Sequence, residues 1–451
     1  MHIHFARIKG NSRGICQQVC ITFFISVFMV TMKHPLTSQI PGLYSPTTLT
    51  EVNSPQSPLG DSLIAIVGAR VIDGLGGVPI EDAVVIIDGN RIVNVGTRDE
   101  IKIPANAIIH NAVGKTLMPG LIDSHLHSVN NDEFLNVILK KGTTSLRDPG
   151  HPFRFYQVLD FGKYAMPRAF LTGSHLDGYP GVYKDHAMLV KNHGHARQQV
   201  YDYVSKGSSG IKIYFRLPLE YYTTIVKAAE ACHIPVFAHL ELVDADDAIR
   251  AGINGIEHVT SFGTAIADPT AAMEFKNNVR AHSSARSDGR YQLWSKIDLQ
   301  SERVNEVLQV SAEHQLVLSP TLTTFERQSD DPRAKEHEAK AFKNMLEFVG
   351  MAHKAGVKIV TGSHTSGWYA DYGWAYQREM ELLVESGLTP MEVIQSSTIL
   401  NARYFRSESR IGSIEVGKLA DLLILDANPL DDISNMRKIS RVMLNGVWVE
   451  D

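Results

Sequence analysis

Two histidines separated by one residue end an apolar run at residues 120–127, GLIDSHLH. Side chains two residues apart on a β-strand point to the same face. If this run is a buried strand, His125 and His127 can therefore bind one metal ion, because neutral imidazole is a common ligand of zinc and related ions. An ordinary pair of buried, hydrogen-bonded histidines is the alternative interpretation of these two residues alone.

Three later apolar runs carry side chains that can join such a site. Their segments are IKIY at 211–214 with Lys212, PVFAH at 235–239 with His239, and GIEH at 255–258 with His258. Burial and nearby cations lower the pKa of a lysine, and a neutral amine can react with carbon dioxide to give a carbamate that bridges two metal ions. Lys212 can instead pair with an anion. Four strand-end histidines around such a lysine predict a site for two divalent metal ions, and neutral imidazoles favour zinc.

An eighth apolar run ends in TGSHT at residues 361–365. An aspartate would be expected there as a carboxylate ligand and general base, and the sequence has His364 instead. Imidazole both ligates metals and titrates near neutrality. We therefore expect His364 to belong to the metal site and to act as its acid–base group, together with Lys212 as a catalytic residue.

The elements that must position these residues alternate between apolar β-rich runs and helical patterns, which is typical of parallel βα units. The eight runs lie near residues 116–124, 143–147, 168–172, 210–215, 236–240, 255–259, 316–321 and 357–362. Eight units predict an α/β fold of the (β/α)8 TIM-barrel type, whose chemistry sits at the C-terminal ends of the strands. A doubly wound open sheet is the alternative, but no Gly-rich phosphate loop appears where it would be needed. The long polar segment 261–299 either caps the active site or is a disordered surface excursion.

Both ends of the chain are rich in β-strand patterns. Residues 83–95 read as two strands joined by a tight turn, and residues 420–425 and 442–449 are again strands, the second broken by an Asn-Gly turn. We therefore expect a small composite β-sandwich domain from residues 61–118 and 408–451. The barrel domain, residues 119–407, is inserted between its two parts.

These segments together resemble the amidohydrolase superfamily, especially its imidazolonepropionase-like and prolidase-like branch. The matching segments are PGLIDSHLH at 119–127, GTTSLRD at 142–148, IKIY at 211–214, AH at 238–239, EH at 257–258 and IGSIEVGKLAD at 411–421. The resemblance runs from about residue 63 to the C-terminus, and it implies a metal-bearing barrel that hydrolyses amide or related C–N bonds. It further implies that His125 and His127 hold one metal, that His239 and His258 hold the other, and that carbamylated Lys212 bridges them.

The departure from the family pattern is His364, where the family usually carries aspartate. Three hypotheses follow: a binuclear metal hydrolase, a mononuclear deaminase or cyclic amidase with unmodified Lys212, and a catalytically silent metal-binding homologue. The branch includes enzymes that act on dipeptides and N-acyl amino acids, so a small-molecule or dipeptide substrate of this kind is expected. Tyr214, Arg216 and His175 are candidates for holding it, and each can equally be a structural residue of the barrel mouth.

The first residues have the pattern of an export signal. Arg7, Lys9 and Arg13 precede an apolar run at 21–30, ITFFISVFMV, so residues 1–32 are expected to form a signal peptide or membrane anchor. A true start at Met29 or Met32 is the alternative. The protein is then exported or membrane-anchored in the first case and cytoplasmic in the second. Residues 33–60, rich in Pro, Ser and Thr, are expected to be a linker that contributes nothing to the catalytic fold.

Composition excludes several classes of protein. The chain has 451 residues, is 44% hydrophobic and 21% charged, and carries a formal net charge of -5, which offers no basic surface for nucleic acid. Three cysteines exclude a disulfide scaffold. The sequence leaves open whether the protein is a homo-oligomer.

Overall fold

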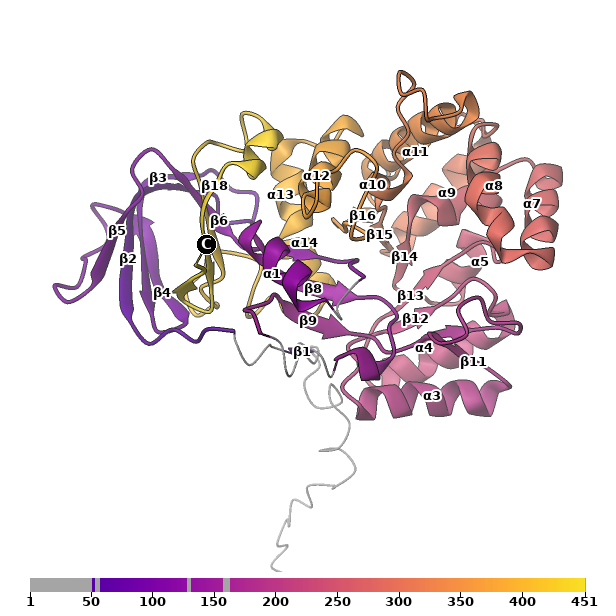
Figure 1. Ribbon diagram of the computed structural model, residues 1–451, viewed down its shortest axis with the longest axis horizontal. Coiled ribbons are helices and arrows are strands. Elements are labelled where there is room, and N and C mark those ends of the chain that lie inside the picture. The colour runs from indigo at the N-terminus through magenta and orange to yellow at the C-terminus, as the bar shows by residue number, and fades with distance from the viewer. Residues whose placement is uncertain (1–50, 53–56, 128–130, 157–162, 451) are drawn as a thin grey trace, which may run out of the picture.

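Parallel strands form the centre of the molecule in the computed structural model, which describes residues 51–52, 57–127, 131–156 and 163–450 (Figure 1). They lie in two sheets, of orders β1-β9-β8-β7 and β11-β10-β12-β13-β14-β15-β16, and all pairs are parallel except β1 with β9. The strands are β1 (Glu51–Val52), β7 (Leu121–Asp123), β8 (Thr143–Asp148), β9 (Arg168–Leu171), β10 (His175–Asp177), β11 (Ala187–Leu189), β12 (Ile211–Ile213), β13 (Val236–His239), β14 (Gly255–Glu257), β15 (Val317–Ser319) and β16 (Lys358–Ile359).

Backbone hydrogen bonds join the two sheets at two places. The Ser124 N–H donates to the Thr361 carbonyl oxygen at 3.0 Å, which links the end of the edge strand β7 to the chain after the edge strand β16. The Ser209 N–H, two residues before β12, donates at 2.6 Å to the carbonyl oxygen of Leu171, the last residue of β9. Each of the eight predicted runs contains one of these strands, so the α/β class is confirmed. The parallel strands nevertheless form two sheets rather than one unbroken ring.

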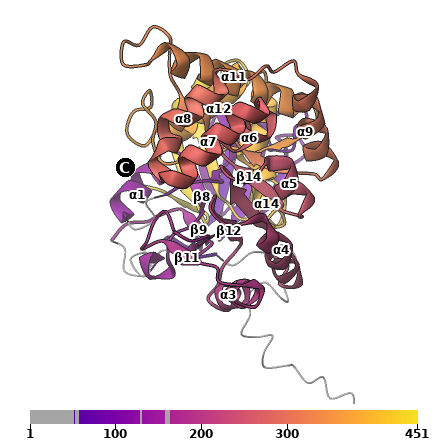
Figure 2. The same cartoon turned by 90° about the vertical axis from the view of Figure 1, so that its right-hand side faces the viewer.

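Helices surround these strands (Figures 1 and 2). The α-helices are α1 (Asp132–Lys140), α3 (His193–Ser205), α4 (Tyr222–Ala231), α5 (Ala245–Arg250), α6 (Gly263–Ile266), α7 (Pro269–Ala281), α8 (Arg286–Trp294), α9 (Glu302–Glu313), α10 (Leu322–Phe325), α11 (Glu336–Lys354), α12 (Ala375–Glu385), α13 (Pro390–Ser397) and α14 (Ile399–Tyr404). The helix α4 shows why they pack as they do: Tyr222, Ile225, Val226 and Ala229 recur at helical spacing and are buried in the main hydrophobic core. None of the helices in the described part of the chain is long and apolar enough to cross a bilayer.

The segment 261–299 folds into helices α6, α7 and α8 and is called here the helical insertion. Asp268 caps α7, since its carboxylate accepts from the backbone N–H groups of Thr270 and Ala271 at 2.9 and 3.1 Å. Trp294, at the end of α8, is fully buried. The insertion is therefore an ordered part of the fold, and the alternative of a disordered excursion is wrong.

A third sheet combines strands from both ends of the chain, in the order β19-β18-β17-β6-β2-β3-β4, with β5 pairing β2. Its strands are β2 (Leu63–Val71), β3 (Ile80–Asp88), β4 (Arg91–Thr97), β5 (Ile108–Asn111), β6 (Thr116–Pro119), β17 (Leu422–Leu425), β18 (Ile439–Leu444) and β19 (Val447–Trp448). The predicted run 116–124 is thus divided at Gly120, with β6 in this sheet and β7 in the barrel. The domain boundaries given above stay predictions.

The first described residues pair with the barrel. Strand β1 runs antiparallel to β9, and Glu51 forms ion pairs with Arg168 at 3.0 Å and Arg410 at 2.9 Å. Arg168 is 1% exposed, and its Nη1 also lies 2.7 Å from the carboxylate of Asp421, the residue before β17. At Glu51 and Val52 the structure therefore has a strand where the sequence predicted linker. The predicted leader, residues 1–32, lies outside the described residues.

We predict that Glu51→Gln lowers the free energy of unfolding, because it removes the negative charge that pairs with the buried Arg168. The expected cost is about 1–3 kcal/mol, less than for an isolated buried pair because Asp421 still binds this arginine. Urea unfolding measures it. The control is Glu81→Gln, whose partner Arg70 is on the surface, with side chains 64% and 35% exposed, and which should change stability by less than about 0.5 kcal/mol. Equal stability of the two variants would contradict a role for Glu51 in the fold.

Candidate functional site

A cavity of about 360 Å³ opens among the C-terminal ends of the parallel strands. Its lining includes His125, His127, His175, Lys212, Tyr214, His239, His258 and His364, so eight of the nine predicted site residues meet in one place. A larger hollow of about 840 Å³ lies over residues of the 326–346 region and contains none of these residues. The smaller cavity is therefore the candidate site.

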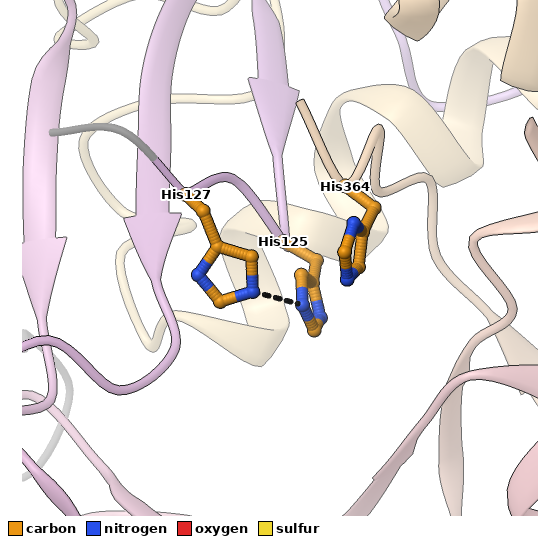
Figure 3. Close-up of side chains that lie close together, drawn as sticks. All are labelled: His125, His127 and His364. Carbon is orange, nitrogen blue, oxygen red and sulfur yellow. Dashed lines mark hydrogen bonds between the residues drawn. The ribbon is translucent and has the colours of Figure 1, made fainter. Parts of the chain in front are cut away.

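The paired histidines after β7 face one another across a short gap (Figure 3). The Nε2 atoms of His125 and His127 are 3.2 Å apart. Two nitrogens bound to one tetrahedral zinc at about 2.0–2.1 Å are separated by roughly 3.3–3.4 Å. His364 stacks beside His125 with ring centroids 5.0 Å apart, and candidate ligand atoms of all three histidines lie within 4.8 Å of one another. The three imidazoles therefore fit a shared metal ion.

A buried carboxylate sets the orientation of His125. Glu257 at the end of β14 is fully buried and is bound by His125 Nδ1 and by the guanidinium of Arg147. Because a carboxylate only accepts hydrogen bonds, Nδ1 of His125 carries the hydrogen and Nε2 keeps its lone pair. Arg147 is itself buried, and its Cζ lies 3.9 Å from the ring centroid of Phe237 and 4.4 Å from that of Tyr404.

The second histidine pair lies on β13 and just after β14. The ring centroids of His239 and His258 are 4.6 Å apart. One nitrogen of each has a partner, since His239 Nε2 lies 2.9 Å from Glu241 and His258 Nδ1 lies 2.7 Å from the Thr321 hydroxyl. The other nitrogen of each ring is thereby available as a ligand. Among the described residues no further His, Cys, Asp or Glu completes a group of three with this pair.

Lys212 on β12 is 3% exposed, and its Nζ has no hydrogen-bond partner. Burial lowers the pKa of this amine to about 7, with Glu257 opposing the shift and Arg147 adding to it. A substantial fraction of the amine is therefore neutral near pH 7, as carbamate formation requires. A buried amine without a partner, beside a histidine pair that lacks a third ligand, fits a bridging carbamate between two metal ions.

Burial also keeps five histidines of the cavity neutral. It lowers the pKa of His125, His127, His239 and His258 well below the usual value, and that of His364 to about 4. Neutral imidazole is the form that ligates metals.

Backbone and side-chain bonds connect the turns that carry these ligands. The Asp123 carboxylate accepts from the backbone N–H groups of His125 and Ser363, both at 3.0 Å. The N–H of His364 donates to the His125 carbonyl oxygen at 2.7 Å. His364 has a φ of 52°, a strained conformation for a residue other than glycine. The turns after β7 and β16 are thus held against each other.

Sequence reasoning missed the charged residues behind the ligands, which are Asp123, Arg147, Glu241 and Glu257. Asp123 and Glu257 stand within the very motifs that supply histidine ligands, and Arg147 stands in the strand segment 143–148. A charge inside an otherwise apolar strand is the signal that could have identified them, because such a charge must be paired when buried.

The candidates for substrate binding separate into two groups. The Tyr214 hydroxyl accepts from Arg286 at 2.9 Å, and the ring of His175 lies 4.4 Å from that of Tyr214, with its Nε2 unpartnered. Arg216 does not line the cavity. It donates to the Ser283 hydroxyl and the Val279 carbonyl oxygen, both at 2.8 Å, and so anchors the helical insertion. Its role in substrate binding stays a prediction.

The helical insertion covers one side of the cavity. Arg286 and Arg290, one turn apart on α8, both line it. Arg290 donates to the Glu241 carboxylate at 2.7 Å. Of the two expectations for residues 261–299, the ordered cap is the one that the structure supports.

Comparisons with known proteins identify the family of the chain. The sequence profile of the amidohydrolase family matches residues 205–449, more than half of the chain. The imidazolonepropionase of Alkaliphilus oremlandii is 24% identical over 390 residues, covering 77% of this chain and 85% of that protein. The adenine deaminase of Mesorhizobium japonicum is also 24% identical, but this chain spans only 52% of its length.

A solved structure of a Xaa-Pro dipeptidase with bound methionine in the active site has a TM-score of 0.65 to this protein. The two sequences are 23% identical, and the alignment covers 86% of this chain and 100% of that one. This likeness concerns the fold. The profile match over more than half of the chain shows that it belongs to the amidohydrolase family, whose members hydrolyse carbon–nitrogen bonds.

Proposed function

We propose that this amidohydrolase cleaves the amide bond of a peptide-like or N-acyl amino acid substrate with the help of two divalent metal ions, zinc being favoured by the ligands. The observation that carries the proposal is the meeting, in one cavity, of two histidine pairs and a buried lysine amine without a partner. The named relatives and the dipeptidase fold support hydrolysis at a C–N bond.

Each pair would hold one metal ion, His125 with His127 and His239 with His258, and a carbamate on Lys212 would bridge them. The carbamate forms when the Nζ lone pair bonds to the carbon of carbon dioxide. The electrons of one C–O π bond then move to oxygen to give the carboxylate, and the amine releases a proton. Two bound metal ions supply Lewis acidity and lower the pKa of water. Glu257 and Glu241 keep the rings of His125 and His239 in place for this role.

His364 would transfer the proton during hydrolysis. Its ring is neutral near pH 7, since burial lowers the pKa of His364 to about 4. A neutral imidazole can accept a proton from the attacking water and return it to the departing nitrogen, which would otherwise be a poor leaving group. If one nitrogen of His364 ligates a metal, only the other is free for this transfer.

One observation favours a second candidate, a mononuclear deaminase or cyclic amidase. The ligand atoms of His125, His127 and His364 lie within 4.8 Å of one another, which is enough for one metal without any carbamate. The imidazolonepropionase and adenine deaminase relatives are consistent with that reading. A silent homologue is the third outcome, in which metal binds and no amide is hydrolysed.

We predict about two divalent metal ions per purified chain, and about one or fewer after Lys212→Ala or His239→Ala. Elemental analysis gives the count, and a carbamate carbon signal should appear by NMR after incubation with ¹³C-bicarbonate in the wild type alone. The matched control is Lys358→Ala, an exposed lysine on barrel strand β16, which should keep both metals. One metal per chain, unchanged by Lys212→Ala, would favour the mononuclear candidate.

His364→Ala is expected to lower kcat by about 10²–10⁴-fold, the usual contribution of a positioned acid–base group. His364→Asp should preserve or raise kcat, because a carboxylate can take over the proton transfer. The substrate comes from a screen of dipeptides, N-acyl amino acids and lactams. His282→Ala, at an exposed position after α7, should leave kcat unchanged. Wild-type turnover in His364→Ala would remove His364 from the mechanism.

The metal-free protein should lose stability in acid partly through His364. The unfolded imidazole binds a proton near pH 6.5, whereas the pKa of folded His364 is about 4. Between these values the unfolded state holds more protons, so acid favours unfolding. Relative to His364→Asn, the wild type should therefore lose about 1–3 kcal/mol between pH 7 and pH 4 in urea unfolding. A stability difference that stays constant with pH would show that this ring does not titrate as inferred.

A further inference from the structure

Arg286 places a cation in the cavity against two neutral phenols. It is the first residue of α8, and its guanidinium donates to the hydroxyl of Tyr214 at 2.9 Å and to that of Tyr183 at 2.8 Å. Its Cζ lies 4.8 Å from the ring centroid of Phe215. The guanidinium is therefore half-buried among aromatic rings, and the two side chains that it is shown to bind carry no charge.

The cavity supplies no anion for this cation. The lining within the described residues contains no aspartate or glutamate. Glu241, which lies behind the wall, is bound by Arg290 one turn further along α8. Glu241 also attracts Arg286 through space, but no hydrogen bond or ion pair joins these two side chains. Arg286 therefore differs from Arg290 in that no carboxylate of the described residues binds its guanidinium directly, so its donors can bind a further anion.

We infer that Arg286, with Tyr183 and Tyr214, binds a carboxylate of the substrate and thereby selects acids over neutral amides. A guanidinium has five N–H donors in a planar fork that matches the two oxygens of a carboxylate. Both phenol oxygens accept from Arg286, so each hydroxyl hydrogen remains free to donate to the same anion. Three side chains of the protein can therefore surround one carboxylate.

The position of this anion site restricts the substrate. Tyr214 follows Lys212 by two residues at the end of β12, and its ring centroid lies 4.9 Å from that of His239. A carboxylate held there stands only a few bonds from an amide at the proposed metal centre. The inference rests on the proposed function for the identity of the bond cleaved, but the anion site itself does not require that any bond be cleaved.

The test measures binding to the purified full-length protein by calorimetry. The probes are 4-oxopentanoic acids that carry amino-acid side chains at C2, together with their matched primary amides. In these compounds a CH₂ group replaces the scissile N–H of an N-acetyl amino acid, so they cannot be hydrolysed at that position. We expect at least one acid to bind about 10- to 100-fold more tightly than its amide.

Arg286→Gln should abolish this preference, because it weakens the binding of the acid far more than the binding of the amide. Arg286→Lys should retain part of the preference. Arg280→Gln, an exposed arginine of the same helical insertion, should leave it intact. The inference is overturned if the wild type binds no acid more tightly than its amide, or if Arg286→Gln weakens acid and amide equally. Hydrolysis is assayed separately on dipeptides and N-acyl amino acids. If no compound is hydrolysed but the acid is still preferred and the preference depends on Arg286, the proposed function is refuted and the anion site is not.

Discussion

The site depends on one buried charge pair, Glu257 with Arg147. A carboxylate withdrawn from water costs several kcal/mol unless an opposite charge and further hydrogen bonds compensate it. Arg147 provides the charge, and the Nδ1–H of His125 provides the remaining bond. The ring of His125 cannot turn without leaving that carboxylate acceptor unpaired, so its Nε2 stays directed at His127. The packing of Arg147 and Glu257 in the barrel centre therefore also fixes the position of the His125 ring relative to His127.

Replacement of the family's usual aspartate by His364 changes the charge of the centre as well as its shape. An imidazole is neutral where a carboxylate would be negative, so a centre holding the same two divalent ions keeps one more positive charge. No carboxylate lines the cavity in the described part of the chain to offset it, and Arg286 adds to it. With two ions bound, the cavity would therefore be more positive than the same site with an aspartate at this position, in a protein whose formal net charge is -5. Such a pocket attracts anionic ligands over distances of about 10 Å.

The sequence predicted the parallel strands and the clustering of the histidines because both follow from local patterns. Apolar runs of strand length bring their C-terminal ends together in such a fold, and His125, His239 and His258 all lie at those ends. The sequence could not predict the contacts of Arg216. Its spacing on the fourth run resembles that of Tyr214, but the packing of the helical insertion determines its hydrogen-bond partners. The sequence also could not predict that Arg286 and Arg290 of α8 line the cavity, since only tertiary packing brings this helix to it. Glu51 was assigned to a linker because strand pairing at a sheet edge leaves almost no signature in a two-residue strand.

The division of one apolar run at Gly120 has a dynamic consequence. The N–H of Gly120 donates to Asp421 in the C-terminal part of the chain, and the N–H of the next residue, Leu121, donates to Gly142 in the barrel. A side chain at 120 would collide with Thr144, since a Cβ there would lie 2.2 Å from its hydroxyl oxygen. Opening of the C-terminal strand β17 is therefore expected to loosen β7, which ends two residues before His125. Amide hydrogens of β7 and β17 should therefore exchange in a common opening event, so that the stability of β17 also affects the position of His125, about 300 residues earlier in the chain.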